Sequence, residues 1–286
     1  MKILVTGKTG QLSCEINKIS SLYNFEWIFL DRNSFDLSDL NSINSNLDKI
    51  SPNIIINCAA LTSVNYAESN FDYANIVNNQ SVSLIAKWCN LNNRKLLHIS
   101  TDYVYSGSLE IPINEDVVAD PLNNYGRTKL LGDLACLEFN PSSIIIRTSW
   151  LYSSFGNNFV KKMISLMMKK KELDVINDQI GSPTYAADLA KVILDIISFS
   201  NWKPGLYNYT NEGKISWYDL ANNIKSIYGF TDVVIKPISS MKYSKNVKRP
   251  KYSLLDKTKI IKTFNISLVP YIESLKMCIN ILKNEK

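Results

Sequence analysis

Histidine is almost absent from this sequence, and its few cysteines form no metal-binding pattern. The chain of 286 residues holds one histidine, His98, and five cysteines with no C-x-x-C spacing. Zinc sites and disulfide frameworks need paired or closely spaced ligands. We therefore expect no metal site, and free thiols of the kind found in a reducing cytoplasm. His98 lies inside an apolar segment, and we interpret it as a packed side chain rather than a catalytic one.

Long apolar runs and clusters of one charge are lacking as well. No run approaches the length of a membrane span, and the segment after Met1 shows no signal-peptide pattern. We therefore expect a cytoplasmic protein with no membrane partner. The net charge of +6 is spread along the chain, and its longest run, residues 169–171, suits a solvated helix end. Nucleic-acid binding needs a clustered basic face, so we expect no nucleic-acid partner.

The sequence does contain a regular alternation of short apolar segments and helical patterns. Buried strands are predicted at residues 2–6, 27–30, 54–56, 96–99 and 144–147, with helices at 14–19, 40–50, 74–91 and 186–198. This order predicts an α/β fold, a Rossmann-type doubly wound parallel sheet with a smaller C-terminal substrate-binding lobe. We expect residues 1–148 to form an NAD(P)-binding domain, completed by the helix at 186–198. Residues 149–286 are then mainly the substrate-binding lobe.

A glycine-rich turn follows the first strand directly. Gly7-Lys8-Thr9-Gly10 leads into a helix, an arrangement that lets the backbone approach a pyrophosphate at a helix N-terminus. Ser13 stands where a third glycine is usual, and the loop lacks the Gly-Lys-Ser/Thr of a Walker motif. Asp31 and Arg32 follow the second strand; an acid there binds the NAD ribose, and an arginine holds the 2′-phosphate of NADP. Both NADH and NADPH stay open as the cofactor.

The chemical candidates lie between residues 95 and 129. Thr101 and Asp102 end the fourth predicted strand, at the edge where open parallel sheets bind ligands. Pro121 suits a helix start, and Tyr125 and Lys129 lie four residues apart on that helix. An adjacent ammonium lowers the pKa of a tyrosine, which suits proton transfer to a carbonyl oxygen. A Tyr-x-x-x-Lys pair arises by chance about once in a chain of this composition. The pair supports a catalytic role only because it follows a strand that ends in Ser-Thr and lies downstream of the glycine-rich turn.

Several further motifs occur in order along the chain. They are the loop at 7–13, Asn57-Cys58-Ala59-Ala60 followed by Thr62, Val64, Ala67 and Glu68, Ser100-Thr101-Asp102-Tyr103-Val104-Tyr105, Pro121-Leu122-Asn123, Tyr125-Gly126-Arg127-Thr128-Lys129, Arg147-Thr148-Ser149-Trp150, Val175-Ile176-Asn177-Asp178-Gln179, Gly181-x-Pro183-Thr184 and Arg249-Pro250-x-x-Ser253-x-Leu255-Asp256. Together these motifs resemble one family, the dTDP-4-dehydrorhamnose reductases among the extended short-chain dehydrogenase/reductases. The resemblance covers nearly the whole chain. Ser13, Cys58 and Tyr105 depart from the usual residues, and none of these changes removes a group that the chemistry needs.

The resemblance implies NAD(P)H-dependent reduction of the C4 ketone of a nucleotide-linked 6-deoxysugar, with Tyr125 as proton donor. It implies that Lys129 lowers the pKa of Tyr125 and holds the nicotinamide ribose, and that Thr101 binds the substrate oxygen. The implied cofactor residues are Gly7, Gly10, Gln11, Leu12, Asp31, Arg32, Asp36, Leu37, Ala59, Ala60, Tyr125 and Lys129. The implied substrate residues are Thr62, Val64, Thr101, Asp102, Trp150 and Arg249.

Other interpretations stay open. A reductase or epimerase for a UDP- or GDP-linked sugar is the main alternative, and a non-catalytic nucleotide-binding regulatory subunit is another. A dehydratase on this fold would carry a glutamate after Asp102, where Tyr103 stands. Some relatives hold magnesium at a dimer contact; Glu15 fits that pattern but Ala187 does not, so we predict no metal there. A homodimer is compatible with the family.

Overall fold

A six-stranded parallel sheet organises the larger lobe. The computed structural model describes residues 1–199, 202–243 and 247–284. The strands run in the order β10-β5-β4-β3-β1-β2, and every pair is parallel. Their bounds are β1 (Lys2–Thr6), β2 (Glu26–Leu30), β3 (Ile54–Asn57), β4 (Lys95–Thr101), β5 (Ile144–Thr148) and β10 (Gly205–Asn208). This confirms the predicted Rossmann-type α/β fold.

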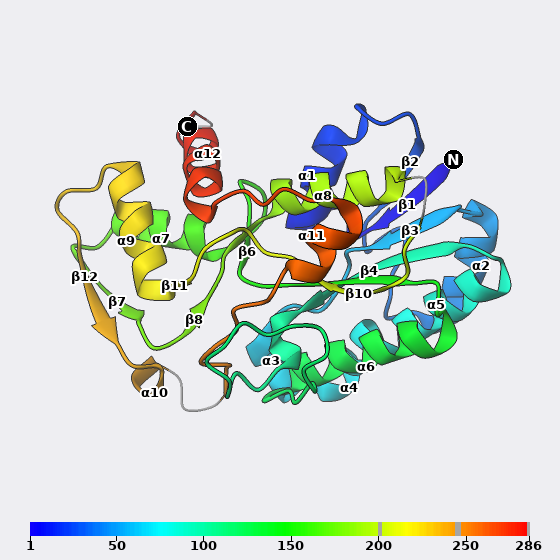
Figure 1. Cartoon of the computed structure of the whole chain (residues 1–286), viewed down its shortest axis with the longest axis horizontal. Coiled ribbons are helices and arrows are strands. Elements are labelled where there is room, and N and C mark those ends of the chain that lie inside the picture. The colour runs from blue at the N-terminus through cyan, green and yellow to red at the C-terminus, as the bar shows by residue number, and fades with distance from the viewer. Residues whose placement is uncertain (200–201, 244–246, 285–286) are drawn as a thin grey trace.

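Helices cover both faces of this sheet (Figure 1). Alternate strand residues point to opposite faces: Ile3 packs with the first helical layer, whereas Leu4 packs with the second. The first layer holds α1 (Gln11–Ser20), α8 (Ala186–Ser198) and α11 (Thr258–Phe264). The second holds α2 (Leu40–Ile50), α5 (Ser81–Leu91) and α6 (Asn124–Phe139). Because both faces are buried, the strands are continuously apolar, as in other parallel sheets.

A second lobe has its own apolar core and lies at the opposite end of the molecule (Figure 1). Its larger elements are α7 (Phe159–Met167), β7 (Glu172–Ile176), α9 (Trp217–Tyr228), β12 (Val234–Ile238) and α12 (Tyr271–Asn284). Its shorter ones are β6 (Leu151–Tyr152), β8 (Ile180–Gly181), β9 (Thr184–Tyr185), β11 (Ile215–Ser216) and α10 (Ser240–Tyr243). The chain returns from this lobe to the sheet twice after β5, in α8 with β10 and in α11.

One predicted helix begins earlier and is less regular than expected. Residues 71–91 form α4 (Phe71–Asn75), a π-helical turn (Ile76–Gln80) and α5, and the short α3 (Val64–Ser69) precedes them. The π-turn carries Asn78, whose side-chain amide bonds both backbone groups of Leu61 and also the hydroxyl of Thr128. Such insertions often occur at functional sites. Here the irregular turn secures the loop after β3 against α6.

Pro121 was predicted to begin the helix that carries Tyr125, and this is wrong. α6 begins at Asn124, and its N-cap is Asn123, whose side-chain oxygen accepts the Gly126 N–H at 2.9 Å. An asparagine cap satisfies a helix donor that a proline cannot. The amide nitrogen of Asn123 also donates to the Lys248 carbonyl. The helix start is therefore tied to the segment that carries Arg249.

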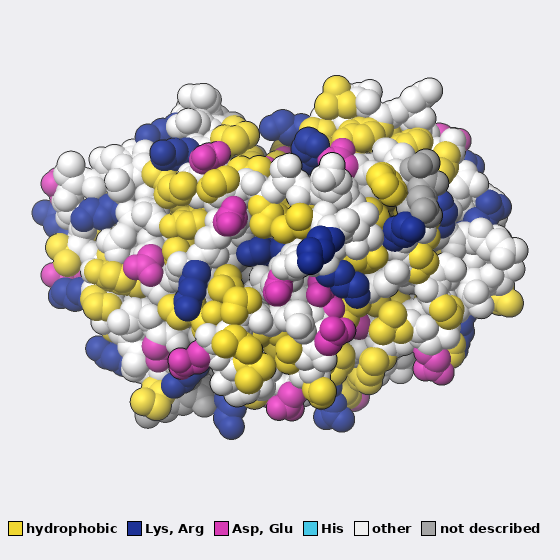
Figure 2. Space-filling model, in the orientation of Figure 1, with side chains coloured by type: hydrophobic (Ala, Val, Ile, Leu, Met, Phe, Trp, Pro, Cys, Tyr) yellow, Lys and Arg dark blue, Asp and Glu magenta, His cyan; other side chains and the backbone are white. Residues whose placement is uncertain are grey.

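No helix of the described residues is both long and apolar enough to cross a membrane. On the face drawn in Figure 2, Lys and Arg side chains are scattered among acidic and apolar ones rather than gathered into one patch.

Candidate active site

A cavity of about 700 Å³ lies at the carboxyl ends of the strands and extends toward the second lobe. It starts at β1 and β3, two neighbouring strands from which the chain continues to opposite sides of the sheet. Open α/β sheets bind ligands at such a switch point. The predicted site residues that line it are Gly7, Gly10, Gln11, Leu12, Arg32, Asp36, Leu37, Ala59, Ala60, Thr62, Val64, Thr101, Asp102, Tyr125, Lys129 and Trp150. Asp31 and Arg249 are not among its lining residues.

The glycine loop brings backbone close to backbone at one end of the cavity. Gly7 has φ +73°, and a Cβ there would lie 3.1 Å from the Ala59 backbone. Gly10 is the N-cap of α1 and supplies no side-chain cap, so the first N–H groups of the helix point to the cavity end. An uncapped helix N-terminus favours an anion. Ser13, in place of the third glycine, is fully buried and donates to the Thr6 carbonyl.

Asp31 and Arg32 are placed differently. The Asp31 carboxylate accepts the Ser34 N–H at 3.0 Å within its own turn, and this bond holds the pKa of Asp31 below its ordinary value. Arg32 lines the cavity, 3.4 Å from Asp36 and 5.9 Å from the centre of the Tyr73 ring. The guanidinium is therefore the charged group of this pair that a ligand in the cavity meets.

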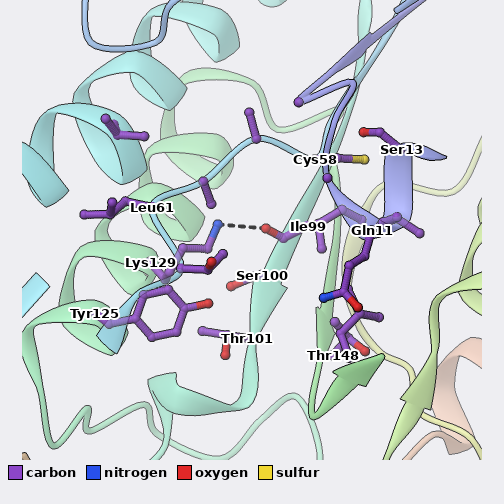
Figure 3. Close-up of a pocket in the computed structure, with 18 of the residues that line it drawn as sticks. Gln11, Ser13, Cys58, Leu61, Ile99, Ser100, Thr101, Tyr125, Lys129 and Thr148 are labelled. Carbon is purple, nitrogen blue, oxygen red and sulfur yellow. Dashed lines mark hydrogen bonds between the residues drawn. The ribbon is translucent and has the colours of Figure 1, made fainter. Parts of the chain in front are cut away.

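Tyr125 and Thr101 meet in the middle of the cavity (Figure 3). Their proximity depends on Gly126, because a Cβ at that position would lie 2.1 Å from the Tyr103 carbonyl oxygen. α6 thus packs directly on the turn after β4. The Thr101 hydroxyl donates to the Asp102 carboxylate at 3.1 Å and accepts the Tyr103 N–H.

The expected lowering of the Tyr125 pKa is not found in the ligand-free chain. Burial raises the pKa of Tyr125, and this effect exceeds the lowering by its hydrogen bond with Thr101. Lys129 is not among the main causes of this shift; its ammonium donates to the Ile99 carbonyl at 2.7 Å (Figure 3). The phenol is therefore held as a proton donor.

Burial also raises the pKa of Asp102, to about 6. Hydrogen bonds from Ser253 and Thr101 lower this pKa, but by less than burial raises it.

The second lobe supplies an aromatic wall. Trp150 adopts φ +49°, and its ring stacks on Trp217 with ring centres 3.6 Å apart. Gly181 lies beneath it, since a Cβ there would approach the Trp150 ring within 2.9 Å. Trp217 begins α9, 67 residues after Trp150 in the chain. Stacked aromatic rings present a rigid apolar face, and Trp150 lines the same cavity as Thr62 and Val64.

Arg249 lies in a second cavity of about 380 Å³. Its guanidinium donates to the Asn65 side chain at 3.2 Å and to the Tyr103 hydroxyl. Lys248 and Lys251 line the same cavity, which makes it basic. Sequence reasoning missed Trp217, Asn65 and the two lysines as site residues, because no spacing rule connects these positions to the β4 motif. It also missed the contact of His98 with Lys129.

Comparisons with known proteins agree with this geometry. The family model described as RmlD substrate binding domain matches residues 1–284. The chain is 36% identical to the dTDP-4-dehydrorhamnose reductase of Aggregatibacter actinomycetemcomitans over 285 residues, 96% of this chain and 97% of that one.

Solved structures give the same similarity. The crystal structure of a dTDP-4-dehydrorhamnose reductase from Clostridium acetobutylicum has a TM-score of 0.94 at 38% identity, and the match covers 99% of this chain and 100% of that one. The enzyme of that name from Bacillus anthracis, in complex with NADP, has a TM-score of 0.91 at 34% identity, with 97% and 98% covered.

Proposed function

Because the chain belongs to the RmlD substrate binding domain family, that of the dTDP-4-dehydrorhamnose reductases, we propose that it reduces the C4 ketone of dTDP-4-dehydro-L-rhamnose with NADPH. One observation carries the proposal. A tyrosine hydroxyl, a threonine hydroxyl and a buried lysine from β4 and α6 line the same cavity as a glycine loop at a helix N-terminus. Nucleotide binding and proton transfer are thereby combined at one sheet edge.

The residues present fit a dinucleotide. Gly7 leaves room for close approach, and the uncapped N-terminus of α1 offers N–H groups to a pyrophosphate. Ala59, directly beside Gly7, and Ala60 line the same cavity with small side chains. We assign Arg32 to the 2′-phosphate of NADPH, because it lines the cavity whereas Asp31 is engaged with Ser34. The bound cofactor would supply the hydride to C4.

The protein supplies the proton and the orientation. Tyr125 donates its phenolic proton to the C4 oxygen as that oxygen gains negative charge. The Thr101 hydroxyl, which donates to Asp102 in the ligand-free chain, turns to donate its hydrogen bond to the same oxygen. The Lys129 ammonium stabilises the phenolate that remains. Burial raises the pKa of Tyr125, so the acid is fully protonated before the reaction begins. Substrate orientation then places the ketone between the acid and the cofactor.

We assign the sugar nucleotide to the cavity wall of the second lobe. The deoxysugar lies between Thr62 and Val64 on one side and the stacked Trp150 on the other. Its nucleoside diphosphate reaches the second cavity, where Lys248, Arg249 and Lys251 supply positive charge. This division makes residues 1–148 with the helix at 186–198 mainly cofactor-binding, and the remaining C-terminal residues mainly substrate-binding.

The direct test is consumption of reduced nicotinamide by the purified full-length chain. We expect turnover with dTDP-4-dehydro-L-rhamnose, and at least tenfold lower kcat/KM with UDP- and GDP-linked 4-keto sugars. Higher kcat/KM with a UDP- or GDP-linked sugar would contradict the named substrate. Cofactor binding without any turnover, together with co-elution of a partner protein on a sizing column, would support a regulatory subunit instead.

Replacing Arg32 with alanine tests the cofactor assignment. We expect the KM for NADPH to rise roughly 10- to 100-fold, the value of a charge-assisted hydrogen bond to a phosphate, while the KM for NADH changes little. The measurement is initial rate against concentration for each cofactor. Asp31→Ala is the matched control from the same turn, and its NADPH KM should stay close to wild type. An equal rise in the KM for NADPH and for NADH would contradict a contact between Arg32 and the 2′-phosphate.

A further inference from the structure

The single histidine of the chain contacts the lysine of the active site. His98 lies on β4 and is fully buried. Its Nε2 is 3.1 Å from the Lys129 ammonium nitrogen, and its Nδ1 is 3.1 Å from the side-chain amide nitrogen of Asn57. The other end of that amide accepts the Thr6 hydroxyl at 2.7 Å. A buried row of polar groups therefore runs from β1 through β3 and β4 to Lys129.

His98 is neutral in this position. Burial lowers its pKa well below the ordinary value, and the Lys129 charge lowers it further. A neutral imidazole carries one N–H and one lone pair. An N–H on Nε2 would point at the Lys129 ammonium, which has only donors to offer, so a charged lysine requires the lone pair there. Nδ1 then carries the hydrogen and needs an acceptor from Asn57.

The orientation of Asn57 and the charge of Lys129 are coupled through this ring. With the amide nitrogen toward the ring, Nδ1 accepts, Nε2 carries the hydrogen, and the arrangement suits an uncharged amine at position 129. With the amide turned, its oxygen accepts the Nδ1 hydrogen and Nε2 is free to accept from the ammonium. The two ends of an amide are nearly equal in size, so both settings occupy the same space.

We propose that His98 is a positioning residue for Lys129: as the Nδ1–H tautomer, held by the Asn57 oxygen, it accepts one lysine N–H and leaves another directed at the active-site cavity. The Ile99 carbonyl accepts a further N–H at 2.7 Å. Two of the three ammonium donors are thus engaged by β4, and the third serves the Tyr125 side of the cavity. This inference rests on the proposed function, because that function requires Lys129 as an ammonium.

The electrostatic setting explains why the acceptor matters. Lys129 is 2% exposed, and burial lowers its pKa. Asp133 on the same helix opposes the lowering, as do Cys136 and Cys58 to a smaller extent. Asp133 Oδ2 is occupied by Arg147, and its Oδ1 lies 4.0 Å from His98 Nε2, beyond hydrogen-bond range. Among these neighbours, His98 accepts a hydrogen bond directly from the ammonium.

Nitrogen NMR with ¹⁵N-histidine tests the proposal without any assay of activity, since one histidine gives one pair of ring signals. In the complex of the full chain with NADPH near pH 7, we expect a protonated Nδ1 and an unprotonated Nε2. As pH rises through the pKa of Lys129, the ammonium is lost and the Nε2–H tautomer should grow in. A protonated Nε2 at neutral pH, or a doubly protonated ring, would overturn the proposal.

Two variants separate positioning from packing. His98→Gln keeps an acceptor oxygen near the place of Nε2, whereas His98→Leu fills similar space without one. We expect His98→Leu to lose roughly 10- to 100-fold in kcat, as for a hydrogen bond to a charged group, with the alkaline limit of the pH profile about one unit lower. His98→Gln should recover most of both. Equal kcat values and equal pH profiles in the two variants, at equal thermal stability, would contradict the positioning role of His98.

The histidine tautomer seen by NMR tests the positioning role of His98, whereas turnover tests the proposed function, so the two claims can fail separately. An Nδ1–H tautomer in a chain that binds NADPH but reduces no keto sugar would sink the proposed function and leave the Lys129–His98 contact standing. A working reductase with the Nε2–H tautomer would sink the positioning role alone.

Discussion

Replacing Tyr125 with phenylalanine is expected to lower kcat by roughly two to four orders of magnitude, the usual contribution of a general acid. Without the phenol, the growing charge on the C4 oxygen is met by the Thr101 hydroxyl and by no acid of comparable placement. Binding should survive, because the ring remains between α6 and the turn after β4. The measurement is steady-state kinetics with dTDP-4-dehydro-L-rhamnose, together with NADPH affinity by fluorescence titration.

Tyr103→Phe is the matched control for that result. Its ring lies edge-on to Tyr125 with centres 5.6 Å apart, and its hydroxyl pairs with Arg249. Loss of that neutral group should cost roughly tenfold or less, mainly in substrate KM. If the two variants lost kcat equally, Tyr125 would not be the proton donor.

Replacing Arg147 with methionine is expected to destabilise the fold by about 3–5 kcal/mol, the cost of leaving a buried charge without its partner. Arg147 Nε donates to the Asp133 carboxylate at 3.0 Å, and its Nη1 donates to the Tyr105 hydroxyl at 2.7 Å. The Asp133 side chain is fully buried and that of Arg147 is 5% exposed. The measurement is the free energy of unfolding from urea titration of the cofactor-free chain.

The double variant Asp133→Asn/Arg147→Met is the control for the unpaired charge. Removing both charges at once leaves no buried ion, so we expect it to be more stable than Arg147→Met alone. A double variant that loses the full sum of the two single losses would mean that packing, rather than charge pairing, sets the cost. Arg147 ends a strand that the apolar pattern predicted, and its structural role comes from Asp133, which no motif marked.

Much of the fold was predictable because its signals are local. A strand buried on both faces reads as a continuous apolar run, and a helix reads by its period. β3 and α8 were therefore found within about one residue of their ends. The irregular helix before α5 and the start of α6 were not predicted, because they depend on groups distant in sequence. Asn78 is held by hydrogen bonds with Leu61 and Thr128, and Asn123 by a hydrogen bond to Lys248.

The candidate site divides in the same way. Gly7, Gly10, Thr101 and Tyr125 were found from spacing and position, since each follows a strand or sits on a helix in a recognisable place. Trp217 was not found, because it reaches the site only by stacking on Trp150 between two segments distant in sequence. The placement of Arg249 in a second cavity was likewise beyond any local rule.

His98 shows most clearly what the sequence determined and what only the tertiary structure decided. The sequence by itself determined that this histidine is buried in a central strand, because a strand flanked by apolar residues on both faces leaves it no access to water. It also determined the order of the strands and helices, and the glycines that a nucleotide-binding turn requires. Only the tertiary structure decided that His98 meets Lys129, because they lie 31 residues apart and hydrogen bonding depends on distance in space. For the same reason the direction of the Lys129 ammonium and the pKa of Tyr125 follow from packing and burial, which no run of residues encodes alone.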